Sequence, residues 1–348
     1  MCKLYSYGIR DQLLLWLQRF FSNRTHQTKV GDFVSELSDL ISGVVQGSGI
    51  RPIMFISFIN DLITALEKHG ITAKLFADDL KLYLHVTDAC DLSRLQSALS
   101  ALEDWERLWQ LSVSPSKCCV LSVGKKVLDD SSLKFSIDGS TLPVVNFCVD
   151  LGITISSDLS PRLHINTIVA KAHKRANAIH RCFISKDINT LMRAFIVYVR
   201  PIVEHNSSLW SPHFKSDIES IERVQRKFTK RLPGFSQYSY QDRLKRLSLP
   251  SLELRRLLHD LILCYKIIFG LINVQCDEFF AFSMRITRGH PYKLTKVSRS
   301  TSCRSQFFSQ RIVNVWNSLP SNTVDFTSLT SFKRSINNVN YSEFLKVF

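Results

Sequence analysis

Two neighbouring carboxylates, Asp78 and Asp79, are the residues of this sequence whose types and spacing could do chemistry. They stand in the middle of the segment ITAKLFADDLKLYLHV, residues 71–86. Hard cations such as Mg²⁺ take oxygen ligands, and two metal ions held close together can bind both the attacking and the leaving oxygen of a phosphoryl transfer. A rigid support that presents paired carboxylates would suit such a reaction.

The sequence around the two aspartates predicts a β-hairpin. Apolar residues alternate with polar ones before the acidic pair, as at Leu75, and after it, as at Leu80 and Leu82. A period of two on both sides of a short polar break is typical of two strands with one buried face. The hairpin would rest on a hydrophobic core and hold Asp78 and Asp79 at its tip. A solvated acidic turn is the alternative, because Asp is a common turn residue.

A glycine-rich loop precedes this hairpin. Residues 42–50 read SGVVQGSGI, and Pro52 is suited to the first turn of a helix that we expect to run to about Lys68. A glycine-rich loop that leads into a helix can approach a nucleotide closely. A tight turn with no ligand is the simpler interpretation of such a loop.

The hydrophobic periodicity of the rest of the chain predicts an α+β fold whose second half is mostly helical. In the first half we expect hairpins at residues 25–37 and 133–142, and Asp88 or Asp91 as the N-cap of a helix. Helices are predicted at residues 10–21, 91–108, 163–184, 189–200, 215–232, 251–270 and 307–319. Further strands are predicted at residues 111–113, 118–123 and 147–155. We interpret the final helix as a packing element, with a base-stacking aromatic as the alternative.

Positive charge is concentrated in the second half of the 348 residues. The chain carries a net charge of +15, of which residues 1–150 contribute −2 and residues 151–348 contribute +17. This asymmetry favours a polyanionic partner, either nucleic acid or an anionic membrane surface, over a merely basic surface. Basic residues repeat on one side of two predicted helices, where they could neutralise phosphates. These candidate nucleic-acid contacts are Lys171, Lys174, Arg175, Arg223, Arg226, Lys227 and Lys230.

The nine cysteines predict reduced thiols rather than disulfides or a zinc site. Their number is odd and no CxxC pair occurs. We expect most of them to be buried in an intracellular protein, in the nucleus or the cytoplasm. The sequence has no signal peptide and no apolar run long enough to span a membrane, so no membrane partner is expected.

Several of these segments together resemble the reverse transcriptases of non-LTR retrotransposons, such as the jockey-like elements. The segments occur in the order GVVQGSGIRPIMFISFINDL, LFADDLKLY, a helix, and LSVSPSKCCVLSVG. The resemblance implies that Asp78 and Asp79 belong to the catalytic hairpin and bind Mg²⁺. It also implies that Lys117 is the general acid, and that Gln46 and Gly47 contact substrate. The implied partners are an RNA template, a DNA primer or target, and deoxynucleotides.

The sequence departs from this family's pattern at several positions. Val45 stands in place of the loop proline, and Ser114 in place of an asparagine. Arg51 stands in place of a glycine, and its side chain could crowd the active site. The first catalytic aspartate of the family lies upstream of Tyr7, and nothing before that residue supplies it. Because two-metal chemistry depends on that third carboxylate, we expect this chain by itself to be weakly active or inactive.

These observations lead to one main prediction with two alternatives. We expect a partial polymerase palm, an antiparallel sheet with packed helices, at residues 1–155. A helical thumb and connection would follow at residues 156–270, and a basic C-terminal region at residues 271–348. The first alternative is a non-catalytic relic that still binds nucleic acid. The second is a basic protein that binds no polyanion.

Overall fold

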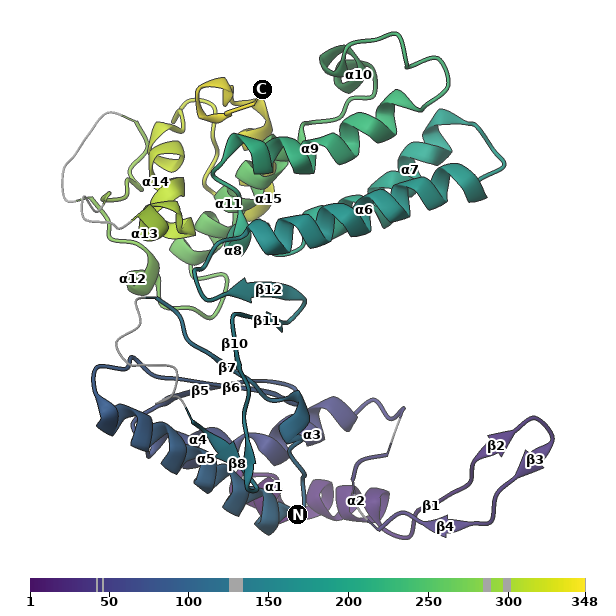
Figure 1. Ribbon diagram of the computed structural model, residues 1–348, viewed down its shortest axis with the longest axis vertical. Coiled ribbons are helices and arrows are strands. Elements are labelled where there is room, and N and C mark those ends of the chain that lie inside the picture. Colours follow the sequence, from purple (N-terminus) through teal and green to yellow (C-terminus); the bar gives the residue numbers. More distant parts are fainter. Residues whose placement is uncertain (42, 46, 125–133, 284–288, 297–301, 348) are drawn as a thin grey trace. The chain divides into compact units, whose positions relative to one another are not determined.

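The chain divides into two compact units, Met1–Val145 and Asn146–Phe348, each of which has its own hydrophobic core. Figure 1 shows the elements of both units in a computed structural model. The residues described are all of 1–348 apart from 42, 46, 125–133, 284–288, 297–301 and 348.

The helices of the first unit agree well with the predicted ones. They are α1 (Cys2–Ser6), α2 (Asp11–Phe21), α3 (Arg51–Ile59), α4 (Asp61–Glu67), α5 (Ala89–Trp109) and the 3₁₀ helix η1 (Pro115–Lys117). The helix expected from Pro52 to Lys68 is present as two helices, α3 and α4, separated by Asn60. Of the two residues predicted as the N-cap, Asp88 takes this position, because its side chain accepts hydrogen bonds from the Cys90 and Asp91 backbone N–H groups of α5.

The strands of the first unit are short and pair two by two. They are β1 (Thr25–His26), β2 (Lys29–Val30), β3 (Phe33–Val34), β4 (Ser38–Asp39), β5 (Thr72–Phe76), β6 (Asp79–Tyr83), β7 (Val120–Leu121), β8 (Ser136–Ile137), β9 (Ser140–Thr141) and β10 (Val144–Val145). Of the hairpins predicted at residues 25–37 and 133–142, the structure has the β2–β3 pair, which turns at residues 31–32, and the β8–β9 pair, which turns at residues 138–139. Among the described residues no pair extends into a larger sheet, and β7 and β10 are parallel rather than antiparallel.

One predicted strand of the first unit is wrong and another is shorter than expected. Residues 111–113 form no strand, and the strand predicted at residues 118–123 is reduced to β7. Leu111 and Val113 instead pack against the hydrophobic core as part of an irregular segment. Their apolar spacing therefore reflects burial, which a short irregular segment can achieve without a strand partner.

The core of the first unit lies between α4, α5 and the β5–β6 hairpin. Leu62 and Leu66 of α4 face Leu99 and Leu102 of α5, and Ala73 of β5 is fully buried beside them. The apolar stripe of α5 has the i, i+3, i+4 spacing of an amphipathic helix, which explains why it covers this core. The hairpin is thus supported along one face by two helices.

The second unit is mostly helical, as predicted. After the β11 (Phe147–Asp150) and β12 (Ile153–Ser156) pair come α6 (Arg162–Cys182), α7 (Ile188–Tyr198), η3 (Arg200–Val203), α8 (Ser207–Trp210), α9 (Lys215–Lys230), α10 (Tyr240–Arg246), α11 (Leu252–Ile268), α12 (Cys276–Phe279), α13 (Ser302–Gln306), α14 (Phe308–Ser318), α15 (Leu329–Ser335), η4 (Ile336–Asn338) and η5 (Ser342–Phe344). The single strand predicted at residues 147–155 is wrong. Leu151 and Gly152 both have positive φ and form a two-residue turn that reverses the chain.

Two hydrophobic clusters stabilise the second unit, and α11 contributes to both. The first cluster gathers α6, α7 and α9, with Phe195 and Phe228 at its centre. The second gathers α11, α14 and α15 around Trp316 and Phe332, neither of which is exposed. Because the Trp316 ring is inaccessible, α14, the helix predicted at residues 307–319, is a packing element, and the base-stacking alternative is wrong for Trp316.

The cysteines are free, as predicted, but most of them are not buried. None of the nine forms a disulfide, and only Cys264 has a buried side chain. The other side chains are half-buried or exposed, and of these Cys118 and Cys276 pack against the edge of a hydrophobic core. Within the described ranges, no helix has the length and apolar character that crossing a bilayer requires.

Candidate polymerase hairpin and basic groove

The β5–β6 hairpin places Asp78 and Asp79 at its tip, as predicted. Phe76 pairs with Asp79, so that Ala77 and Asp78 form a two-residue turn. Ala77 has a φ of 52°, in the left-handed region that such tight turns need. Asp78 therefore lies in the turn itself and Asp79 begins β6, and both side chains are exposed.

The two faces of the hairpin differ in character. On the inner face Ala73 is opposite Leu82 and Leu75 is opposite Leu80, and these side chains contact the core. On the outer face Lys74 is opposite Lys81, and Phe76, which is 65% exposed, is opposite Asp79. The sequence alone did not identify these outer-face residues as candidates. The alternation of apolar and polar residues that predicts the two strands also places Lys74, Phe76 and Lys81 on this face.

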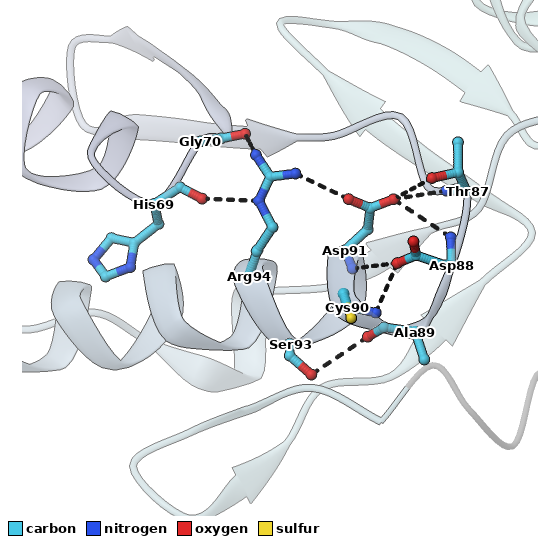
Figure 2. Close-up of polar contacts among 9 residues, drawn as sticks. All are labelled: His69, Gly70, Thr87, Asp88, Ala89, Cys90, Asp91, Ser93 and Arg94. Atoms are coloured by element: carbon cyan, nitrogen blue, oxygen red, sulfur yellow. Dashed lines mark hydrogen bonds and ion pairs between the residues drawn. The ribbon is translucent and has the colours of Figure 1, made fainter.

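A network of polar contacts joins both ends of the hairpin to the start of α5, as Figure 2 shows. The Asp91 carboxylate accepts hydrogen bonds from the Thr87 backbone N–H and hydroxyl, both at 2.8 Å, just after β6. Its other oxygen pairs with Arg94 at 3.0 Å. Arg94 then donates to the backbone oxygens of His69, at 3.3 Å, and Gly70, at 2.5 Å, just before β5.

We call these five residues, His69, Gly70, Thr87, Asp91 and Arg94, the hairpin clamp. The Thr87 hydrogen bonds are the main reason that the Asp91 pKa is lowered to about 2, and the Arg94 guanidinium adds to the effect. The clamp fixes the chain on either side of β5 and β6. The clamp therefore limits the movement of the base of the β5–β6 hairpin, whose tip carries Asp78 and Asp79.

The two aspartates have the donor type that a divalent cation prefers. Carboxylate oxygens are the usual ligands of Mg²⁺. Both side chains are exposed, and neither makes a hydrogen bond or an ion pair with another residue in the described part of the chain. Among those same residues, no group of three or more His, Cys, Asp or Glu side chains converges on one point.

Lys117 and the glycine loop belong to the same unit as the hairpin. Lys117 is exposed at the end of η1, and the adjacent Cys118 packs on the core that also supports Leu75. Gly47 is exposed with a φ of 83°, a conformation that favours glycine. Gln46 lies outside the described residues. Arg51 is exposed in the first turn of α3.

The predicted nucleic-acid contacts lie on α6 and α9, which pack against each other through their apolar faces. Six of the seven are exposed. The exception is Arg226, which is half-buried because its guanidinium stacks on the Tyr240 ring at 5.0 Å. The structure thus brings the basic residues of two helices into one unit, while Asp78, Asp79 and Lys117 belong to the other.

A groove of about 470 Å³ runs between α6 and α9. Apolar side chains, among them Val224 and Phe228, form part of its lining, and the basic residues along it are Lys227, Lys230 and Arg231. Arg231 donates to the Asn177 side chain across the groove at 2.7 Å. No Asp or Glu lies among the described lining residues, so this basic groove has a positive potential that suits a phosphate backbone.

Two histidines also line the basic groove. Partial burial lowers the pKa of His173, with Lys227 and Arg223 adding to the effect. Burial likewise lowers the pKa of His180, with Arg231 and Lys186 adding to it. Both rings are therefore neutral at neutral pH, and the positive charge of the groove comes from lysine and arginine.

Comparison with known proteins shows which family the first unit resembles. Residues 1–144 match the family described as reverse transcriptase (RNA-dependent DNA polymerase). This range covers the clamped hairpin, the glycine loop and Lys117, and it ends one residue before the boundary of the first unit. The first unit is therefore similar to the reverse transcriptases over nearly its whole length.

Three curated relatives show which kind of reverse transcriptase the chain resembles. The chain is 25% identical over 219 residues to a probable RNA-directed DNA polymerase from transposon BS of Drosophila melanogaster, a match covering 60% of the chain and 24% of that relative. It is 22% identical over 236 residues to the RNA-directed DNA polymerase from mobile element jockey of the same species, covering 65% and 26%. The jockey polymerase of Drosophila funebris is 21% identical over 239 residues, covering 66% and 26%.

These relatives confirm the resemblance to the reverse transcriptases of non-LTR retrotransposons. The matches cover more of the chain than the first unit contains, so the likeness continues into the second unit. The chain spans about a quarter of the length of these curated relatives.

Proposed function

We propose that the first unit is the palm of an RNA-directed DNA polymerase and that the second unit begins with its thumb. In this proposal the thumb and connection extend to about residue 270, and residues 271–348 form a C-terminal region. The observation that carries the proposal is the β5–β6 hairpin, which holds two exposed aspartates at the tip of a supported strand pair. This hairpin lies within the residues that match the reverse transcriptase family.

The proposed reaction is the attack of a primer 3′-hydroxyl on the α-phosphate of a deoxynucleotide, directed by an RNA template. Asp78 and Asp79 would hold Mg²⁺, which when bound supplies charge stabilisation for the attacking and leaving oxygens. Lys117 would donate a proton to the departing pyrophosphate. Gln46 and Gly47 would contact the template and the incoming nucleotide. A further carboxylate is needed to hold two metal ions, so we expect this chain alone to extend primers weakly or not at all.

Primer extension on an RNA template with Mg²⁺ tests the proposal. The assay compares this chain with a longer version that includes the upstream sequence of the same element. We expect activity in the longer version and a loss of more than about a hundredfold on Asp78→Asn, because a metal ligand is removed. Asp32→Asn is the matched control, since Asp32 is an exposed aspartate in the turn of another hairpin. Full activity of Asp78→Asn would exclude the proposed site.

The basic groove supports a second candidate, a nucleic-acid-binding protein without polymerase activity. Three cationic side chains and no described carboxylate line this groove. We expect RNA or DNA binding to weaken as salt rises, and the double variant Lys227→Gln/Lys230→Gln to reduce the salt slope by about 2. Lys245→Gln, an exposed change on α10, is the control. Binding with an unchanged slope in the double variant would show that nucleic acid binds elsewhere.

A further inference from the structure

Two aromatic rings and a guanidinium are stacked in a row along α2 of the first unit. The Trp16 and Phe20 rings are one helical turn apart, with 5.6 Å between their centroids and 24° between their planes. The Arg24 guanidinium lies 4.9 Å from the centroid of the Phe20 ring, and its Nε donates to the Phe20 backbone oxygen at 2.8 Å. We call Trp16, Phe20 and Arg24 the stacking ladder. The ladder begins on α2 and ends just before β1 (Figure 1).

The Trp16 end of the stacking ladder faces solvent. Trp16 is 51% exposed, whereas the next residue, Leu17, is only 3% exposed. The buried Leu17 side chain fixes α2 on the first unit, so the exposure of Trp16 does not reflect a detached helix. In the described part of the chain, no ring other than Phe20 stacks on Trp16. A further flat ring can therefore continue the row at this end.

The charges around the ladder favour an anionic partner. Residues 10–30 carry a net charge of +3, although the first unit as a whole carries −1. Arg19 is exposed and lies at position i+3 from Trp16, where side chains on a helix are neighbours. Neither Arg19 nor Arg24 forms an ion pair with another described residue. The one acidic residue of this segment, Asp11, precedes Arg19 by about two helical turns.

Exposed rings beside arginines without acidic partners suit a nucleic-acid strand whose bases are unpaired. A base can stack on an exposed aromatic ring with little regard to its identity, and an adjacent arginine can neutralise a phosphate of the same strand. In a duplex the faces of the bases are already stacked on each other. Phosphate groups alone would gain nothing from the rings. The combination therefore indicates a single strand.

We propose that the stacking ladder binds single-stranded nucleic acid, with one base stacked on Trp16 and a neighbouring phosphate paired with Arg19. Arg24 holds the Phe20 ring in the orientation that supports Trp16. The strand is either RNA or DNA, because both offer the same base faces and phosphates. This inference goes beyond the proposed polymerase reaction and the basic groove, and binding at the ladder requires neither Asp78 nor Lys117.

Fluorescence anisotropy of the full chain with two dye-labelled strands tests the proposal. One strand is a hexanucleotide of adenines, and the other is an abasic hexanucleotide with the same number of phosphates. A site that contacts only phosphates would bind both strands equally. We expect the adenine strand to bind at least about fivefold more tightly, because the abasic strand cannot stack.

Trp16→Leu, which retains an apolar side chain without a flat ring, should reduce this preference to below about twofold, and Trp16→Phe should retain most of it. Arg19→Gln should leave the preference in place and reduce the salt slope by about 1. Phe33→Ala is the matched control. Phe33 is an aromatic residue of β3 that is 85% exposed and stacks on no other described ring, so its removal should leave the preference unchanged.

Circular dichroism identifies any variant that does not fold, and Trp16→Gln provides the same test if Trp16→Leu is unfolded. Equal binding of the two strands, an unchanged preference in a folded Trp16→Leu variant, or an equal loss in Phe33→Ala would each overturn the proposal. Self-association that Trp16→Leu abolishes, measured by sedimentation without nucleic acid, would also overturn it, because the ladder would then be a contact between two copies of the chain. Ribose and deoxyribose versions of the adenine strand should both depend on Trp16, and the tighter one identifies the sugar.

Discussion

Gly70 is the residue at which the hairpin clamp can be tested most directly. It has a φ of 69°, and a Cβ atom added there would lie 2.0 Å from Arg94 Nη2. An alanine at this position would therefore carry the cost of a left-handed conformation, roughly 1–2 kcal/mol. It would also displace the Arg94 guanidinium from the backbone oxygens of His69 and Gly70.

The loss of the Arg94 contacts can be estimated from their exposure. Hydrogen bonds to charged groups contribute about 1.5–3 kcal/mol when buried, but the Arg94 side chain is 46% exposed, which reduces this to about 1–2 kcal/mol. We therefore expect Gly70→Ala to lower the free energy of unfolding of the first unit by about 2–4 kcal/mol in total. Urea unfolding of the full chain measures this change in the free energy of unfolding. Hydrogen exchange of the β5–β6 amides shows whether the hairpin itself is destabilised.

Gly139→Ala is the matched control for this change. Gly139 has a φ of 71° in the β8–β9 turn, and an added Cβ would meet nothing within 4 Å. Gly139→Ala should lower the free energy of unfolding only by the cost of the left-handed backbone conformation, roughly 1–2 kcal/mol. In a protein that already carries Arg94→Met, the destabilisation caused by Gly70→Ala should decrease to that caused by Gly139→Ala. Equal destabilisation by Gly70→Ala and Gly139→Ala in the wild-type background would show that the contacts of Arg94 in the hairpin clamp do not stabilise the first unit.

Three further predictions concern stability. The pKa of Asp91 in the folded protein is about 2, below its ordinary value of 3.8. The ionised Asp91 therefore stabilises the fold fully above about pH 4, and this stabilisation is lost as the pH falls toward 2. In the Asp91→Asn variant, the decrease of the melting temperature that comes from protonation of Asp91 should disappear. Phe228→Ala should cost about 3–5 kcal/mol in thermal unfolding, because the ring is buried between α6, α7 and α9, and a loss below about 1 kcal/mol would contradict this packing. Ser251→Ala should cost about 1 kcal/mol, because the hydroxyl caps α11 through the Leu254 N–H at 3.1 Å, whereas Ser251→Asp should retain most of the stability.

The sequence by itself determined the local elements and the candidate catalytic residues. Alternation around Asp78 and Asp79 predicts a hairpin because a strand exposes every second side chain to the same face, and the structure has this hairpin. The cap at Asp88 was equally predictable, since capping involves residues within one turn of each other. The strand expected at residues 147–155 was wrong because periodicity does not reveal that Leu151 can adopt a positive φ.

Only the tertiary structure decided which distant side chains meet. Arg94 reaches the Gly70 carbonyl across 24 residues of sequence, and the basic groove exists because α6 and α9 pack together. The exposed end of the stacking ladder at Trp16 was also unforeseeable, because apolar residues at helical spacing normally indicate a buried face. Hydrophobic spacing specifies which face of an element is buried, but the partner of that face depends on how the helices pack around a common core.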